Sequence, residues 1–135
     1  MADFTETLQA KSDQLNALDL AGDFTITVTQ ANLTGSKDQP LAISYVGDNG
    51  RPNKPSKGMR RIIASAWGCD TDQLIGKSMT LYCDPTVKYA GKEVGGIRIK
   101  AMSHIKEQGI NVVERISRTK NKTDFISFLS MDKPD

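Results

Sequence analysis

Apolar and polar residues follow two different periods along this chain, and the change of period separates strand segments from a helical segment. Phe24, Ile26 and Val28 alternate with threonines, which predicts a strand with one buried face. Residues 41–45 alternate in the same way and predict a second strand. Residues 59–67 instead follow the spacing i, i+3, i+4, i+7, i+8 of an amphipathic helix. The apolar stripe of this helix consists of Met59, Ile62, Ile63, Ala66 and Trp67.

The second half of the sequence has the alternation typical of β-structure. The predicted strands cover residues 78–82, 87–89, 94–99, 111–117 and 124–131. Asp84-Pro85 ends the first of these strands, because proline cannot donate a hydrogen bond to a sheet. Residues 90–93 supply a turn, so the strands on either side of it are expected to form a hairpin. Gly68 lies where a helix is expected to end, and residues 70–76 predict one further short turn.

Short strands at regular spacing around one helix favour a mainly β fold with few helices, specifically a small, partly open OB-like β-barrel. A terminal helix is expected over residues 3–19. We expect residues 1–135 to form a single domain, with residues 1–17 and 132–135 peripheral. The helix of an OB barrel usually follows three strands, whereas only two precede it here. Either the first strand is long and bent enough to serve twice, or the topology differs.

A basic stretch lies directly ahead of the predicted helix and continues into it. Residues 50–61 contain no acidic residue, and Pro52 and Pro55 keep the first half extended. The cations of this stretch are Arg51, Lys54, Lys57, Arg60 and Arg61. Such a patch suits a nucleic-acid phosphate backbone, and the alternative is a solvated surface. The formal net charge is only +2, so nucleic-acid binding must depend on this local patch.

Binding of single strands needs aromatic rings as well as cations. Tyr45 ends a predicted strand ahead of the basic stretch, while Tyr82 and Tyr89 flank Asp84-Pro85. These three tyrosines are candidates for stacking on bases. The alternative is that they pack at the ends of the barrel with only the hydroxyl in water.

The predicted hairpin adds further cations to this candidate interface. Lys88, Arg98 and Lys100 lie on it, and Lys88 and Arg98 are expected to be neighbours. If Ile97 and Ile99 face the core, the period-two alternation of a strand turns Arg98 and Lys100 outward. Trp67, by contrast, lies on the apolar stripe of the helix and is expected in the core.

Patterns that would indicate an enzyme or a cofactor site are weak. Cys69, Cys83 and His104 match no zinc-ligand spacing, and both cysteines are expected to be buried free thiols of a reducing compartment. A Cys–His nucleophile pair lacks the helper residues that it needs. The glycines at 91 and 95–96 lack the ending of a phosphate loop. We therefore expect no enzyme activity, no metal and no cofactor, and no apolar run approaches the length of a membrane span.

Two stretches resemble a family of small phage and prophage proteins. Residues 54–68 read KPSKGMRRIIASAWG, and residues 74–105 read LIGKSMTLYCDPTVKYAGKEVGGIRIKAMSHI. The shared features are a Lys-Pro stretch, a Met-Arg-Arg helix ending in Trp-Gly, a Ser-Met-Thr-Leu-Tyr strand ending in Asp-Pro, and a Gly-Gly-Ile-Arg-Ile strand ending in Met-Ser-His. The resemblance covers about residues 18–106. The sequence departs from the family at the hairpin turn, where it has Ala90-Gly91.

The resemblance implies an OB-like protein of a phage recombination or replication module that acts in the host cytoplasm. Together with the basic patch, it predicts binding of single-stranded DNA without strong sequence preference. The alternative is a protein-interaction module that inhibits or adapts a host enzyme, such as a nuclease or a defence complex. A phage recombinase or nuclease is a further candidate partner, no membrane partner is expected, and the sequence is compatible with an oligomer.

Overall fold

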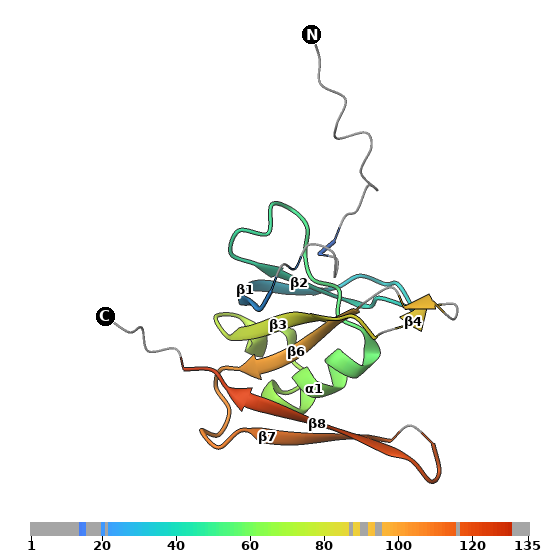
Figure 1. The fold of residues 1–135 in the computed structure, drawn as a ribbon. Coiled ribbons are helices and arrows are strands. Elements are labelled where there is room, and N and C mark those ends of the chain that lie inside the picture. Colours follow the sequence, from blue (N-terminus) through green and yellow to red (C-terminus); the bar gives the residue numbers. More distant parts are fainter. Residues whose placement is uncertain are drawn as a thin grey trace.

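The architecture of the chain is mainly β, as the sequence predicts (Figure 1). The computed structural model describes residues 14–15, 20, 22–86, 88–89, 92–93, 96–115 and 117–130. The helix predicted over residues 3–19 falls largely outside these residues. The strands are β1 (Phe24–Leu33), β2 (Leu41–Tyr45), β3 (Ser78–Asp84), β4 (Lys88–Tyr89), β5 (Lys92–Glu93), β6 (Gly96–Met102), β7 (Ile110–Arg115) and β8 (Asn121–Phe128). The helices are α1 (Lys57–Trp67) and the short 3-10 helix η3 (Thr71–Leu74).

β1 is long enough to pair with two different strands. Its first part, Phe24 to Thr27, pairs with β3, and its second part, up to Leu33, pairs with β2. A register shift between Val28 and Gln30 marks the change of partner. Such a bulge increases the local twist and bends the strand. The first strand therefore does pair twice, but the topology also differs from that of an OB barrel, because α1 follows β2 and precedes β3 and β6.

The main sheet has the strand arrangement of an OB-like barrel with one strand added. Its order is β2-β1-β3-β6-β8-β7. β1, β3 and β6 form an antiparallel meander, which the parallel pair β6–β8 joins to the antiparallel hairpin β7–β8. Without β2, this is a five-stranded, partly open barrel. Among the described residues no ladder joins β7 to β1 or β2, so the sheet stays open.

The hairpin predicted around residues 90–93 is partly wrong. Lys88 pairs with Glu93 and Tyr89 with Lys92, so β4 and β5 form a separate two-stranded ribbon. β6 pairs instead with β3, and Arg98 lies opposite Tyr82. The expected neighbours Lys88 and Arg98 therefore belong to different sheets. β3 and β6 pair at six positions, whereas β4 and β5 pair at only two, so the longer ladder determines the position of Arg98.

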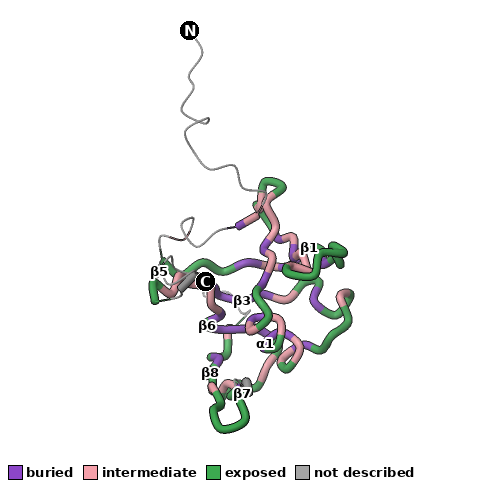
Figure 2. The backbone as a smooth tube through the Cα atoms, turned by 90° about the vertical axis from the view of Figure 1, so that its right-hand side faces the viewer, coloured by how far each residue is buried: buried purple, intermediate pink, exposed green. Residues whose placement is uncertain are grey.

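α1 packs its predicted apolar stripe against the inner face of the sheet. Met59, Ile62, Ile63 and Trp67 are all buried, as predicted. Ser56 caps the helix by accepting from the N–H of Met59, and Gly68 ends it with a positive φ of 93°. The buried positions concentrate in the middle of the molecule, while turns at its rim are exposed (Figure 2). The core thus lies between α1 and the curved sheet.

Candidate nucleic-acid interface

The first half of the basic stretch is held against the edge of the sheet. Asn53 exchanges both backbone hydrogen bonds with Ile43 of β2, at 2.8 Å each, and is itself 1% exposed. Ahead of it, Asp48 accepts from the N–H groups of Tyr45 and Gly50 and closes the turn that leads into Arg51. This local geometry fixes the backbone that carries the cations of the stretch.

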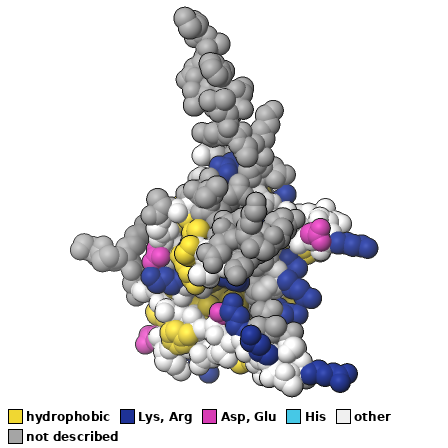
Figure 3. All heavy atoms as spheres, turned by 45° about the vertical axis from the view of Figure 1, so that its right-hand side comes forward, with side chains coloured by type: hydrophobic (Ala, Val, Ile, Leu, Met, Phe, Trp, Pro, Cys, Tyr) yellow, Lys and Arg dark blue, Asp and Glu magenta, His cyan; other side chains and the backbone are white. Residues whose placement is uncertain are grey.

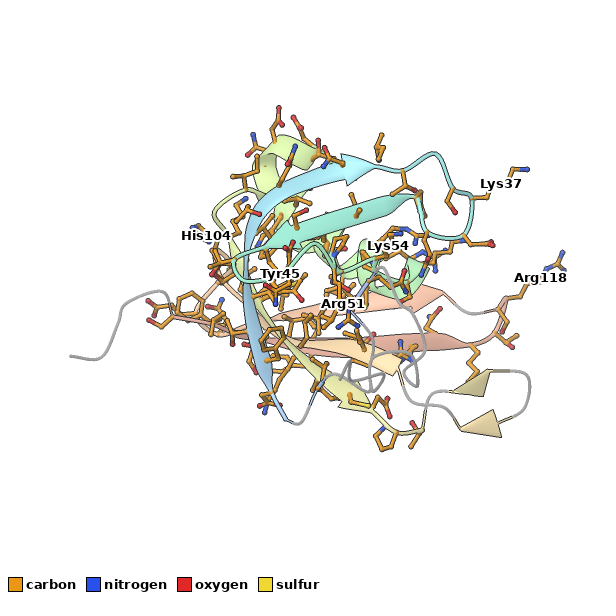
Figure 4. The ribbon with its side chains drawn as sticks, turned by 90° about the horizontal axis from the view of Figure 1, so that it is seen from above. Lys37, Tyr45, Arg51, Lys54, His104 and Arg118 are labelled. Carbon is orange, nitrogen blue, oxygen red and sulfur yellow. The ribbon has the colours of Figure 1, made fainter. Side chains whose placement is uncertain are left out.

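Arg51 is turned inward rather than toward a ligand. Its Nη2 donates to the carbonyl oxygen of Gln14 at 3.1 Å, and the neighbouring Pro52 carbonyl accepts from the N–H of Leu15 at 2.9 Å. Figure 4 places Arg51 close to Tyr45, away from the outer turns. Arg51 therefore has a structural contact with the residues ahead of β1, a role that the sequence interpretation did not assign to it.

The cations of α1 surround a pocket of about 370 Å³ between the helix and the β1–β2 turn. Lys57 and Arg61 are exposed, as expected. Arg60 is half-buried, and its Nη1 donates to the Pro55 carbonyl oxygen at 2.9 Å. The pocket beside these cations shares no lining residue with a second hollow, the groove lined by Tyr82 and Lys100.

Tyr45 is not a stacking residue. It is 6% exposed and belongs to the hydrophobic core. Its ring meets that of Phe24 edge to face, with centroids 5.9 Å apart. Tyr45 ends β2 on the same face as the buried Ile43, so strand alternation directs the ring inward. A buried ring cannot accept a base, and the sequence prediction for this residue was wrong.

The outer face of β3 and β6 carries the remaining described candidates. Tyr82 lies opposite Arg98 in the register of the two strands and is partly exposed. Lys100 is exposed and forms an ion pair with Asp23. Ile99 is buried and Ile97 is partly buried, which confirms the predicted alternation of inward and outward side chains along β6. Tyr82 and Lys100 line a groove of about 330 Å³.

Phe125 of β8 lines the same groove, and the sequence interpretation missed it. Its side chain is 57% exposed, although it is a large apolar residue. The signal was present in the alternation around Ile126: once Ile126 is buried, its neighbours Phe125 and Ser127 must point outward. β6 and β8 pair only at Ala101–Met102, so the earlier parts of the two strands leave space for this groove.

Lys88 and Tyr89 form strand β4 of the β4–β5 ribbon. Only their backbone is described, and their side chains fall outside the described part of the structure. The ribbon follows β3 directly and precedes β6, so it lies at the end of the sheet where Asp84 and Gly96 pair. Their proposed contacts with phosphate or bases thus stay predictions.

Positive side chains gather at this same end of the molecule. Figure 3 shows Lys and Arg along one half of the surface. Lys37 in the β1–β2 turn, Lys54 in the basic stretch and Arg118 in the β7–β8 turn lie on one side in Figure 4, while His104 lies on the opposite side. Turns that are far apart in the sequence therefore place cations on the same side of the molecule, which the local charge pattern does not show.

Asp84 is an anion within this positive environment. Hydrogen bonds from the hydroxyl and N–H groups of Thr86 lower its pKa below the ordinary 3.8, and the charges of Arg98 and Lys122 lower it further. The Arg98 Nε lies 3.8 Å from the carboxylate oxygen. Asp84 is therefore ionised at neutral pH and offsets part of the positive charge of Arg98.

The cysteines and the histidine do not form a reactive group. Cys69 is exposed and Cys83 partly buried, both as free thiols, so the prediction of two buried thiols was wrong. His104 Nδ1 lies 2.6 Å from the hydroxyl of Ser103, which also accepts from the N–H of Ser78. Ser103 is fully buried, so this pair fixes the end of β6 rather than exposing a nucleophile. In the described part of the chain no cluster of His, Cys, Asp and Glu is suited to a metal ion.

Comparisons with protein-family models, with curated proteins and with solved structures give no match to this chain. The resemblance to phage proteins therefore stays a prediction. Within the described segments, no helix combines the length and apolar composition needed to cross a membrane.

Proposed function

We propose that this protein binds single-stranded DNA, without strong sequence preference, across the outer face of β3, β6 and β8. The observation that carries the proposal is the groove that Tyr82, Phe125 and Lys100 line together with Asp23 and Asp124, in which Lys100 forms an ion pair with Asp23. OB-like barrels bind oligonucleotides on the corresponding face, with the adjoining loops. Aromatic rings stack on bases of any sequence, while cations follow the phosphates, so this combination suits binding without sequence preference.

The positive end of the molecule extends this surface. In Figure 4, Arg118 lies on the same side of the molecule as the β4–β5 ribbon, and Lys54 lies between the ribbon side and the centre. A strand that leaves the groove in that direction meets cations from several loops. The role in a phage recombination or replication module, in the host cytoplasm, is part of this proposal and follows from the family resemblance.

Fluorescence anisotropy of a labelled oligothymidine tests the proposal at two salt concentrations, with a labelled duplex as the control. Affinity for the single strand should fall with salt by about 0.7 log units per phosphate contact per log unit of salt. The duplex should bind more weakly, because its bases are not available for stacking. If no oligonucleotide binds at low salt, the proposal is wrong, and an adapter of a host enzyme becomes the better account.

A further inference from the structure

The groove lined by Tyr82 and Lys100 lies where β6 and β8 separate. The two strands pair at only two positions, both at the end of β6, so among the described residues no ladder joins their earlier parts. Asp124 has the same parity in β8 as Ile126, which is fully buried, and yet it lines the groove. Strand alternation thus directs Asp124 inward, while the separation of the strands leaves it accessible from the groove.

The carboxylate of Asp124 has capacity for a ligand beside its own ion pair. The side chain is 32% exposed, and Lys122 Nζ lies 3.9 Å from one carboxylate oxygen, which is longer than a hydrogen bond. The two oxygens of an ionised carboxylate can accept about four hydrogen bonds, so the ion pair with Lys122 does not exclude further donors. Asp23, the other carboxylate that lines the groove, already accepts a hydrogen bond from the Lys100 ammonium group. Asp124 is therefore the better acceptor for a group that enters the groove.

The two carboxylates determine which part of a nucleic acid suits this groove. A phosphate placed here would lie beside Asp23 and Asp124, and like charges repel. A base carries no net charge, and its faces can stack on the exposed ring of Phe125 and the partly exposed ring of Tyr82. The groove therefore suits a base, whose edge then meets a carboxylate, while the phosphates of the strand lie outside it.

The four bases present different groups to a carboxylate. Unstacked bases of a single strand are recognised by hydrogen bonds to their Watson–Crick edges. On this edge guanine has two neighbouring donors, N1–H and the N2 amino group. Cytosine and adenine have one amino donor beside a ring-nitrogen acceptor, and thymine has one N–H between two carbonyl oxygens. Guanine alone can give a carboxylate two parallel hydrogen bonds, in the geometry that a guanidinium group uses.

We propose that Asp124 gives the groove a preference for guanine, by accepting hydrogen bonds from N1–H and the N2 amino group of one stacked base. This inference rests on the proposed function, because it assigns a base preference to the same groove. The preference concerns one nucleotide, and the rest of the bound strand is held without regard to its sequence. In a duplex this edge of guanine is paired with cytosine, so the contact requires a single strand.

Labelled oligothymidines of about nine nucleotides, within the site size of one OB fold, test the inference when their central base is replaced. In fluorescence anisotropy, central guanine should bind about fivefold or more tightly than central adenine, the lower end for a bidentate contact to a base. Inosine, which lacks only the N2 amino group, should bind about twofold or more weakly than guanine. 7-Deazaguanine keeps both donors and should bind as guanine does. Equal affinity for guanine and inosine, or a loss of affinity with 7-deazaguanine, would overturn the inference.

Two matched variants locate the contact and separate this inference from the proposed function. Asp124→Asn keeps the shape of the side chain but replaces one acceptor oxygen with a donor, so the affinity ratio of guanine to adenine should fall to about one. Asp23→Asn removes the other carboxylate of the groove and should keep the wild-type ratio. A wild-type ratio in Asp124→Asn, or equal binding of all the oligonucleotides by wild type, refutes the guanine preference and leaves DNA binding standing. If wild type binds none of them, the proposed function and the preference are both wrong.

Discussion

The indole Nε1–H of Trp67 donates a hydrogen bond of 2.7 Å to the backbone carbonyl oxygen of Ser103. This bond connects the last residue of α1 to the residue that follows β6. The N–H of Ser103 in turn donates to the carbonyl oxygen of Ser78 at 2.8 Å. Ser103 is thus a junction of α1, β3 and β6, and the Lys77 ammonium group covers the Trp67 ring at 5.8 Å from its centroid. The position of α1 against the sheet depends on this junction.

Trp67→Phe should therefore destabilise the protein. Phenylalanine keeps an aromatic ring in the core but leaves the buried Ser103 carbonyl oxygen without its donor, which costs about 1–3 kcal/mol. Urea unfolding monitored by circular dichroism measures the difference. As a control, Ile75→Val changes an exposed apolar residue and should alter stability by much less. An unchanged unfolding midpoint for Trp67→Phe would show that the bond contributes nothing.

Ile63→Asp should unfold the domain, because Ile63 is 2% exposed and a buried, unpaired carboxylate costs several kcal/mol or more. Ser65→Asp places the same charge on the exposed side of the same helix and should leave the protein folded. Thermal melts of the two variants give the comparison. A cooperative melt of Ile63→Asp at the wild-type temperature would contradict the packing of α1.

The sequence was sufficient for features that depend on local periodicity. The stripe of α1 is buried as predicted because residues at helical spacing must share one face. β2 has the predicted bounds, Leu41–Tyr45, because the alternation and the flanking turns are both local. The first strand was recognisable up to Thr29, where threonines alternate with apolar residues, while the bulge between Val28 and Gln30 interrupts this alternation.

The errors concern contacts between distant residues. Tyr45 was assigned to the surface because the sequence does not show that Phe24 covers it. Arg98 was paired with Lys88 because a turn between them is visible locally, whereas its partner Tyr82 depends on the register of β3 and β6. The outward direction of Phe125 follows from local alternation, but its position beside Tyr82 and Lys100 does not, because those residues belong to β3 and β6. Periodicity gives the face on which a side chain lies, but not what lies opposite it.

Gly109 lies against Phe125 and Ile126 of β8, and its replacement should be costly. Its φ is 81°, and an added Cβ would meet the Ile126 carbonyl oxygen at 2.7 Å and the Phe125 ring at 2.6 Å. Gly109→Ala should therefore lose about 1–2 kcal/mol for the backbone conformation and about 1–3 kcal/mol more for the clash.

Gly35→Ala is a matched control for this substitution. Gly35 has the same φ of 81°, but no atom lies within 4 Å of an added Cβ. The difference between the two variants in denaturant unfolding isolates the clash with β8. If both variants lose the same stability, the close contact between Gly109 and β8 is refuted.

Acid should reveal the environment of Asp84. Its pKa is lowered in the folded state, so the stability that it contributes is present above the unfolded pKa and is lost as the pH falls below about 4. Thr86→Val removes the hydroxyl that is the largest cause of this lowering and should raise the pKa of Asp84. NMR titration of the carboxyl carbon measures the shift. Thr123→Val, an exposed substitution on β8, should leave the titration of Asp84 as it is in wild type.

The last prediction separates stacking from charge at the proposed DNA interface. Tyr82→Ala and Phe125→Ala should each weaken binding of an oligothymidine by roughly 1–3 kcal/mol per stacked base, with the salt slope nearly unchanged. Lys54→Ala and Arg118→Ala should instead make the slope shallower, by about 0.7 for each phosphate contact that is lost. Reversal of Arg60 and Arg61 to Glu extends the test to the cations of α1.

Val113→Ala is the matched control for the aromatic variants. Val113 is 62% exposed and lies on the same face of the β7–β8 hairpin as Phe125, but it does not line the groove. Its replacement should leave affinity and salt slope unchanged, because no ring is lost. If Val113→Ala weakens binding as much as Tyr82→Ala, or if neither aromatic variant weakens it, bases do not stack in this groove. Binding that still depends on Lys54 and Arg118 would then be electrostatic attraction alone.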